Sequence, residues 1–207
     1  MVSYLTLGIT YAFAAAVQPG PFQSYLISQT LSKGWRRTLP VAFAPLLSDG
    51  PIIVLVVILL SRIPGWFVNV LQCVGGVFLF YLALNALKAW RNFNTETAIH
   101  STSNRQSVMQ AVVVNILNPN PYLSWSFVMG PLLLRGWRET PVNGIALLAG
   151  FYVSMIVSLM GIILLFAFAK TLGPRVTRPL IGVSAIALAC FGIYQLWFGL
   201  KYFGAYL

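Results

Sequence analysis

Long apolar runs separated by short polar connections dominate the chain. Dividing the sequence at clusters of charged residues, proline and glycine gives six apolar stretches, which cover residues 3–32, 39–61, 66–90, 107–134, 141–170 and 176–200. A run of about 20 apolar residues is long enough to cross the hydrocarbon core of a bilayer as a helix. The pattern therefore predicts an all-α integral membrane protein with six transmembrane helices.

One connection is much more polar than the others. Residues 91–106 read RNFNTETAIHSTSNRQ, and three apolar stretches lie on each side of them. We expect one transmembrane domain over residues 1–207, composed of a first half at about 1–90, a cytoplasmic loop at about 91–106 and a second half at about 107–207.

Two short motifs recur in the two halves at nearly the same spacing. The first half contains Gln18-Pro19-Gly20-Pro21-Phe22 and then Lys33-Gly34-Trp35-Arg36, and the second contains Asn118-Pro119-Asn120-Pro121-Tyr122 and then Arg135-Gly136-Trp137-Arg138. Because each half has three stretches, the second half enters the membrane from the opposite side. The motifs therefore predict two inverted three-helix repeats, an architecture typical of secondary transporters.

The proline motifs lie near the middle of the first and fourth stretches. Proline lacks a backbone donor and clashes with the preceding turn, so we expect these two helices to be broken there. In lipid, such a break is tolerated only where it faces protein or a wet cavity. We expect new half-helices to begin near Phe22 and Tyr122, with free N–H groups that suit an anionic group.

The second stretch contains Asp49, the only acidic residue outside the polar connections, since the other two are Glu96 and Glu139. An ionisable side chain within a membrane span is a functional candidate because burying it there is costly. Asp49 can bind a substrate ammonium group or carry a coupling proton or cation, and both roles stay open. The predicted substrate site consists of Gln18, Pro19, Gly20, Pro21, Gln23, Asp49, Asn115, Asn118, Pro119, Asn120 and Pro121.

The composition agrees with a membrane protein and argues against a nucleic-acid partner. Hydrophobic residues make up 58% of the chain and charged residues 8%, whereas a soluble domain has about 25% charged residues. The net charge of +10 comes from Lys and Arg at the ends of the apolar runs rather than along one face. Membrane lipid and a small-molecule substrate are therefore the expected partners, and a homo-oligomer stays open.

The basic residues are unevenly divided between the two predicted sides of the membrane. One side has Lys33, Arg36, Arg37, Lys88, Arg91, Arg105, Lys170, Arg175 and Arg178, and the other has Arg62, Arg135, Arg138 and Lys201. Cytoplasmic loops carry the excess of Lys and Arg. We therefore expect the loops after the first, third and fifth stretches to be cytoplasmic, with both termini outside.

Other chemistry is sparse. Cys73 and Cys190 stand alone within apolar stretches, and His100 lies in the polar connection, so no metal site and no cofactor is predicted. No nucleophile and base pair indicates an enzyme. A divalent-cation or other inorganic-ion exporter is the nearest alternative, although a metal route favours several clustered ligands. A membrane thiol carrier that uses the two cysteines is a further alternative.

A stripe of small residues runs along the fifth stretch at helical spacing. Its members are Gly150, Ser154, Ser158 and Gly161. Small residues allow two membrane helices to approach closely, so the stripe predicts a helix contact rather than a site.

The whole chain resembles the lysine-exporter (LysE/RhtB) family of amino-acid efflux proteins. The resemblance depends on the six-stretch plan, Pro19-Gly20-Pro21, the basic loop Lys33-Gly34-Trp35-Arg36-Arg37, and Asn118-Pro119 early in the second half. It implies export of an amino acid or related small metabolite across the bacterial inner membrane, driven by a proton or ion gradient.

Overall fold

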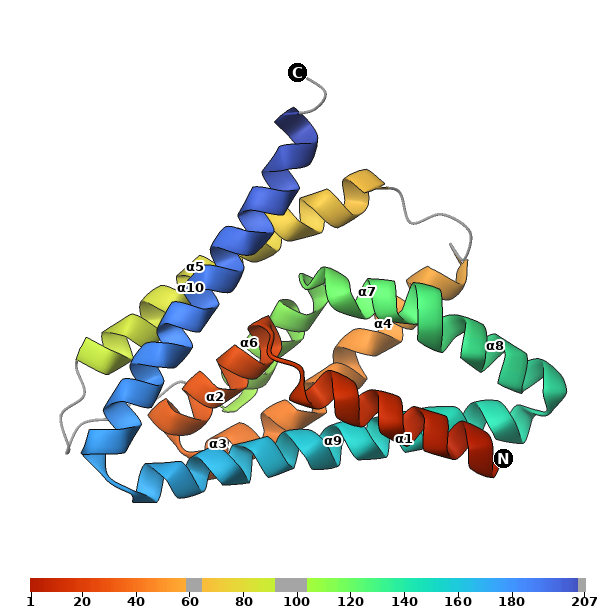
Figure 1. The fold of residues 1–207 in the computed structure, drawn as a ribbon, viewed down its shortest axis with the longest axis horizontal. Helices are drawn as coiled ribbons and strands as arrows, with labels where there is room; N and C mark the ends of the chain where they lie inside the picture. The colour runs from red at the N-terminus through yellow and green to blue at the C-terminus, as the bar shows by residue number, and fades with distance from the viewer. Residues whose placement is uncertain (59–64, 92–103, 205–207) are drawn as a thin grey trace.

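The structure, a computed structural model, describes residues 1–58, 65–91 and 104–204. The described residues are almost entirely helical and include no strand (Figure 1). In chain order the helices are α1 (Val2–Val17), α2 (Pro21–Lys33), α3 (Trp35–Thr38), η1 (Leu39–Phe43), α4 (Ala44–Ile58), α5 (Gly65–Arg91), α6 (Asn104–Ile116), α7 (Pro119–Ser124), η2 (Trp125–Met129), α8 (Gly130–Glu139), α9 (Pro141–Thr171) and α10 (Pro174–Gly204).

Within the described residues, four helical segments are long and apolar enough to cross a membrane. They are Trp35–Val56, Asn69–Arg91, Pro141–Thr171 and Pro174–Lys201, with mean hydropathies of 1.9, 1.9, 2.4 and 1.8. They correspond to the second, third, fifth and sixth predicted stretches. The chain is therefore an all-α, multi-pass membrane protein.

The first and fourth predicted stretches are helical but interrupted. Helix α1 has 16 residues and is about 24 Å long at 1.5 Å per residue, less than the roughly 30 Å of a bilayer core. Helix α2 continues it after a break of three residues, Gln18 to Gly20. In the fourth stretch α6 ends at Ile116, and α7, the π-helical segment η2 and α8 follow after Leu117 and Asn118.

Proline explains where the second half-helices begin. Pro21 is the first residue of α2, and Pro119 is the first residue of α7. An N–H group has no intrahelical acceptor in the first turn, so proline is tolerated there. Helix α7 thus begins three residues before Tyr122, because Pro121 also fits in its first turn.

Two pairs of helices, α1 with α9 and α5 with α10, are in close contact. Helices α1 and α9 run in the same direction, with Gly150 against the backbone of Leu5 and with Ser154 Oγ donating to Ile9 O at 2.9 Å. The predicted packing role of the small-residue stripe therefore fits Gly150 and Ser154. Helices α5 and α10 are antiparallel, and Gly76 and Phe80 both lie against Gly192 (Figure 1).

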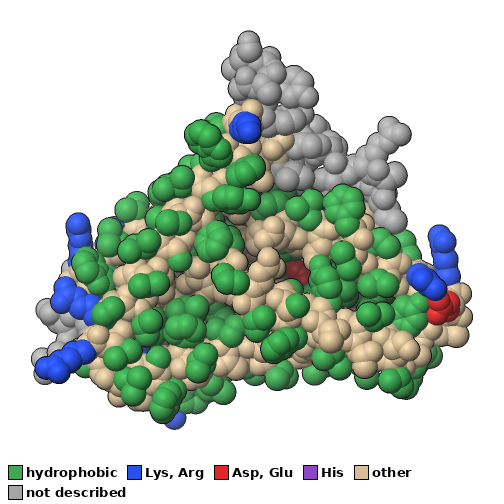
Figure 2. Space-filling view, in the orientation of Figure 1, with side chains coloured by type: hydrophobic (Ala, Val, Ile, Leu, Met, Phe, Trp, Pro, Cys, Tyr) green, Lys and Arg blue, Asp and Glu red, His purple; other side chains and the backbone are tan. Residues whose placement is uncertain are grey.

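Buried side chains form two clusters that meet in the middle of the molecule. One lies around α2, α6 and the α5–α10 pair, and the other around α1, α4, η2 and the first half of α9. Met155 packs against both clusters. Outside this core, hydrophobic side chains cover most of the face shown in Figure 2, and Lys and Arg lie at its margins.

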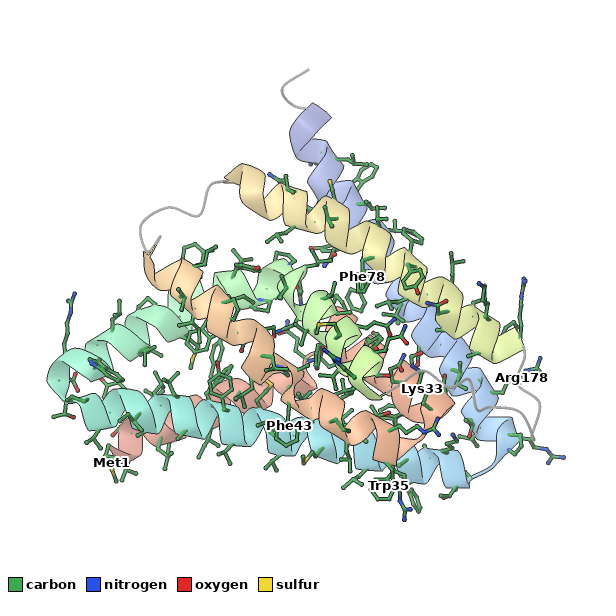
Figure 3. All side chains as sticks on the ribbon, turned by 180° about the vertical axis from the view of Figure 1, so that it is seen from behind. Met1, Lys33, Trp35, Phe43, Phe78 and Arg178 are labelled. Atoms are coloured by element: carbon green, nitrogen blue, oxygen red, sulfur yellow. The ribbon has the colours of Figure 1, made fainter. Side chains whose placement is uncertain are left out.

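The two ends of the molecule can be told apart from labelled residues. Arg178 lies at one end with Lys33 and Trp35 toward the same end, and Met1 lies at the other (Figure 3). Gly34 at this first end has φ of +86°, a conformation that glycine adopts without strain, and it allows α2 to turn into α3.

Candidate functional site

The first break is stabilised by a side chain that folds back across it. Gln18 and Gly20 have extended backbone conformations, as expected for a residue before proline and for an uncapped helix start. Gln23 Nε2 donates to the carbonyl oxygens of Ala15 and Ala16 at 3.1 Å each. Those carbonyls lie in the last turn of α1, where intrahelical donors are missing. Gln23 therefore satisfies the end of α1.

The second break is stabilised at its other side. Asn118 is extended, with φ of −84° and ψ of 124°, and its Oδ1 accepts a hydrogen bond from Asn120 N at 3.1 Å. This is an N-cap of α7. Helix α2, by contrast, has Gly20 at the N-cap and no side-chain capping bond. The start of α2 is therefore the less satisfied of the two helix starts.

Asp49 is buried between the two breaks. Asp49 is only 4% exposed. Its Oδ1 accepts a hydrogen bond from Asn115 Nδ2 at 2.9 Å. The same Asn115 group lies 2.7 Å from Ser48 Oγ, and the indole of Trp125 also hydrogen-bonds the carboxyl group. Asn115 precedes the second break and Trp125 follows it, so the acid on α4 is held by the second broken helix.

No basic side chain in the described part of the chain pairs with Asp49. Within residues 1–58, 65–91 and 104–204, the only ion pair is Arg135 with Glu139, at 3.2 Å on the exposed surface of α8. A buried carboxylate without a cation partner is unfavourable in an apolar environment. The arrangement can therefore accept a proton, a cation or the ammonium group of a small molecule.

A cavity of about 400 Å³ joins Asp49 to both breaks. The predicted residues that line it are Gln18, Pro19, Gly20, Gln23, Asp49, Asn115, Asn118, Asn120 and Pro121. Pro21 and Pro119, the first residues of α2 and α7, do not line it and act on the backbone instead. Figure 2 shows an acidic side chain at the bottom of a hollow near the middle of the molecule.

Several residues outside the predicted set also line this cavity. They are Tyr11, Ala14, Ala15, Phe22, Pro45, Ser124, Trp125, Phe151 and Met155. Phe22 was visible as the aromatic residue after the first motif. The aromatic residues on α9 and η2 carried no such signal, because apolar aromatic residues are common throughout membrane helices.

A polar network joins α2 to α6 on the side of the cavity nearer Lys33. The Tyr25 hydroxyl is buried and lies 3.0 Å from both Ser107 O and Gln110 Oε1. Lys33 Nζ donates to Ser107 Oγ at 3.1 Å. Burial, and secondly the charge of Arg37, lower the pKa of Lys33. These contacts hold the two half-helices together beyond the cavity.

A second contact joins the other two half-helices. Tyr11 on α1 and Ser124 at the end of α7 share a hydrogen bond, and both residues line the cavity. Each half-helix that follows a break is thus bonded to the half-helix that precedes the other break.

The residues that a thiol carrier would use do not line the cavity. Cys73 on α5 is half-buried, Cys190 on α10 is exposed, and neither lines it. His100 and Glu96 lie outside the described residues. Among the residues that are described, no three His, Cys, Asp or Glu side chains form a cluster suited to a metal ion.

Comparison with known proteins identifies the family. The sequence model of the LysE type translocator family matches residues 13–198. Neither the curated proteins nor the solved structures contain a match to the chain. The chain belongs to the LysE type translocator family, whose members are transporters rather than enzymes and export amino acids or related compounds.

Proposed function

We propose that this LysE-type translocator is a secondary active exporter of an amino acid or related small zwitterionic metabolite, and that it works by alternating access. The observation that carries the proposal is the cavity between the two helix breaks, whose described lining has one buried carboxyl group, several amides and no basic side chain. Such a lining suits a small molecule that presents an ammonium group.

In this proposal Asp49 has two alternative binding partners, and it binds only one of them at a time. It binds the substrate ammonium group, or it binds a proton that enters as the substrate leaves. Either way the carboxylate gains a positive partner that the described residues around it do not supply. Competition between proton and substrate for one acid would couple export to a proton gradient.

The substrate carboxylate is assigned to the first break. Helix α2 has 13 residues and no side-chain cap, so N–H groups in its first turn are available to an anion. At α7, Asn118 already occupies one such N–H. The further candidate donors are two exposed amides that line the cavity, Gln18 at the first break and Asn120 at the second.

Two features of the packing support inverted repeats. Helix α1, which precedes the first break, packs on α9, and α6, which precedes the second break, packs on α4. Each first half-helix thus packs on the second span of the opposite half. The antiparallel pair of α5 and α10, with Gly192 against Gly76 and Phe80, is where a two-fold axis in the membrane plane would pass.

Alternating access would use the two polar contacts between half-helices. The Tyr25, Ser107 and Gln110 contacts close the cavity toward the Lys33 end, and the contact of Tyr11 with Ser124 closes it toward the other end. Opening one pair while the other stays bonded would expose Asp49 to one side at a time.

We further propose the bacterial inner membrane as the location, with both termini outside. The supporting observation is the excess of Lys and Arg on the side of Lys33 and Arg178, opposite Met1 (Figure 3). Export then runs from the Lys33 end to the Met1 end.

A metabolite-resolved efflux screen tests the proposal. Cells with and without the protein are loaded with single amino acids and dipeptides, and the metabolites inside and outside are measured over time. We expect faster efflux of at least one amino acid and relief of growth inhibition by it, both reduced when an ionophore collapses the proton gradient. Unchanged amino-acid efflux together with increased tolerance of a divalent cation would favour the inorganic-ion alternative instead.

A further inference from the structure

We infer that this exporter selects a neutral amino acid with a large apolar side chain over basic, acidic and small amino acids. The inference rests on the proposed function, because it assigns the substrate class of the same cavity. It depends on two separate properties of the lining, its charge and its aromatic residues.

The charge of the lining excludes a second charge on the substrate. Asp49 is the single charged residue among the described residues that line the cavity. Once it binds the α-ammonium group, a basic side chain would find no second carboxylate in this described lining, and Glu139 at the end of α8 is bonded to Arg135 and Asn143. An acidic side chain would find no basic residue in the same lining. An unpaired buried charge costs several kcal/mol, so either substrate would bind weakly.

An aromatic wall begins directly beside the carboxyl group. It consists of Tyr11, Trp125 and Phe151, all of which line the cavity. Trp125 hydrogen-bonds Asp49, and its ring lies 5.4 Å from that of Phe151 in an edge-to-face arrangement. The Phe151 ring lies 6.5 Å from that of Tyr11. A substrate whose ammonium group is at Asp49 therefore has its α-carbon next to these rings.

This arrangement favours binding of a substrate with an apolar side chain. Aromatic faces attract the ammonium group itself, and a large apolar side chain buries its surface against the same rings. A small side chain such as that of alanine leaves this contact unmade. One extra or missing methylene group in an apolar pocket changes the specificity by about 10- to 200-fold.

The size of the cavity agrees with one amino acid. Small-molecule sites are usually about 300 to 1,000 Å³, and this cavity, at about 400 Å³, is near the lower limit. It accommodates an amino acid of the size of leucine or phenylalanine together with a few water molecules.

Counterflow in proteoliposomes tests the inference. Vesicles containing the purified protein are preloaded with unlabelled leucine, phenylalanine, alanine, lysine or glutamate, and uptake of the same labelled amino acid is measured. We expect leucine and phenylalanine to exceed alanine by about tenfold or more, with lysine and glutamate near the level of empty vesicles. Counterflow of lysine, glutamate or alanine that is faster than that of leucine and phenylalanine would overturn the inference and leave amino-acid export intact. Absence of counterflow for every amino acid would overturn the proposed function as well.

Variants on α9 separate specificity from folding. Phe151→Leu keeps an apolar side chain, and we expect it to lower the ratio of phenylalanine to alanine counterflow about tenfold while leucine is still transported. Phe168→Leu is the matched control, because Phe168 is on the same helix but 66% exposed. An unchanged ratio in Phe151→Leu, or an equal change in Phe168→Leu, would contradict a role of the aromatic wall in selection.

Discussion

The two helix breaks have similar prolines but are stabilised in opposite ways. At the first, the Gln23 side chain satisfies the end of the preceding helix, and the following helix α2 starts without a cap. At the second, the Asn118 side chain caps the start of the following helix α7. Proline thus interrupts the backbone in the same way at both breaks. The neighbouring amide side chains determine which backbone N–H and C=O groups at each break remain without a hydrogen bond.

The difference extends to the acid. Asn115 and Trp125, on either side of the second break, both bond to Asp49, and no residue at positions 18–23 has a described bond to it. The second break therefore holds the carboxyl group, and the first offers the free helix start. A zwitterion needs both, which is why one break alone would not form the proposed site.

The largest expected effect comes from removing the carboxyl group on α4 that the second broken helix holds. We expect Asp49→Asn to lower export by about 100-fold or more, because the substrate ammonium group or the coupling proton loses its only charged partner, an effect of about 3 to 5 kcal/mol. Efflux from cells with equal amounts of membrane-inserted protein measures this. Asp49→Glu, which keeps the charge, should retain more export than Asp49→Asn, and normal efflux from Asp49→Asn would rule out the proposed role.

The next effect comes from restoring a continuous helix at the first break. Replacing Pro19 and Pro21 by alanine removes penalties of about 3 kcal/mol each for proline in a helix interior, so we expect α1 and α2 to join. The free start of α2 would disappear, and export should fall about tenfold or more. Pro179→Ala, within the continuous helix α10, is the control and should export normally. Normal export by the joined variant would show that the broken helix is not part of the site.

A smaller effect distinguishes the two stabilising amides. Asn118→Ala removes the α7 cap and should lower stability by about 1 kcal/mol, which is about 2 to 4 °C in melting temperature. Asn118→Asp keeps a hydrogen-bond acceptor at the N-cap, so it should retain most of the stability that Asn118→Ala loses. At Gln23 the need is for a donor, so Gln23→Glu should destabilise the protein as Gln23→Ala does. Thermal unfolding of the purified protein measures all four, and equal behaviour of Asn118→Asp and Asn118→Ala would contradict the capping role.

The smallest effect concerns the contacts between half-helices. Tyr25→Phe removes a hydroxyl that bonds α2 to α6, and Tyr11→Phe removes one that bonds α1 to α7. Side-chain hydrogen bonds in membrane proteins contribute about 0.6 kcal/mol on average, so each shifts the conformational equilibrium about threefold. We expect Tyr25→Phe to increase labelling of the cavity from the Lys33 side and Tyr11→Phe to increase it from the other side. Shifts in the same direction would contradict two opposed gates.

Much of this arrangement could be predicted from the sequence, because it depends on local chemistry. Proline lacks a donor wherever it stands, so the breaks near residues 18–21 and 118–121 were predictable. Asp49 was identifiable because an acid within an apolar stretch is rare. The described residues include four segments long enough to cross a membrane and breaks in the first and fourth stretches, whereas the six-helix plan with inverted repeats stays a prediction.

What could not be predicted depends on contacts between distant segments. The bond of Asn115 to Asp49 joins residues 66 positions apart, and the bond of Tyr11 to Ser124 joins residues 113 apart. Nothing near Phe151 in the sequence distinguishes it from other aromatic residues of α9. Its place beside Trp125 follows only from the tertiary contact between α9 and η2.

Protection of cysteines at both breaks tests most directly whether one site lies between them and requires Asp49. In a protein with Cys73→Ser and Cys190→Ser, Gln18→Cys places a thiol at the first break and Asn120→Cys at the second, both at exposed positions that line the cavity. We predict that the best-exported amino acid slows thiol labelling at both positions with the same half-maximal concentration, and that adding Asp49→Asn abolishes protection at both. Protection at only one position, or protection that persists with Asp49→Asn, would contradict the account.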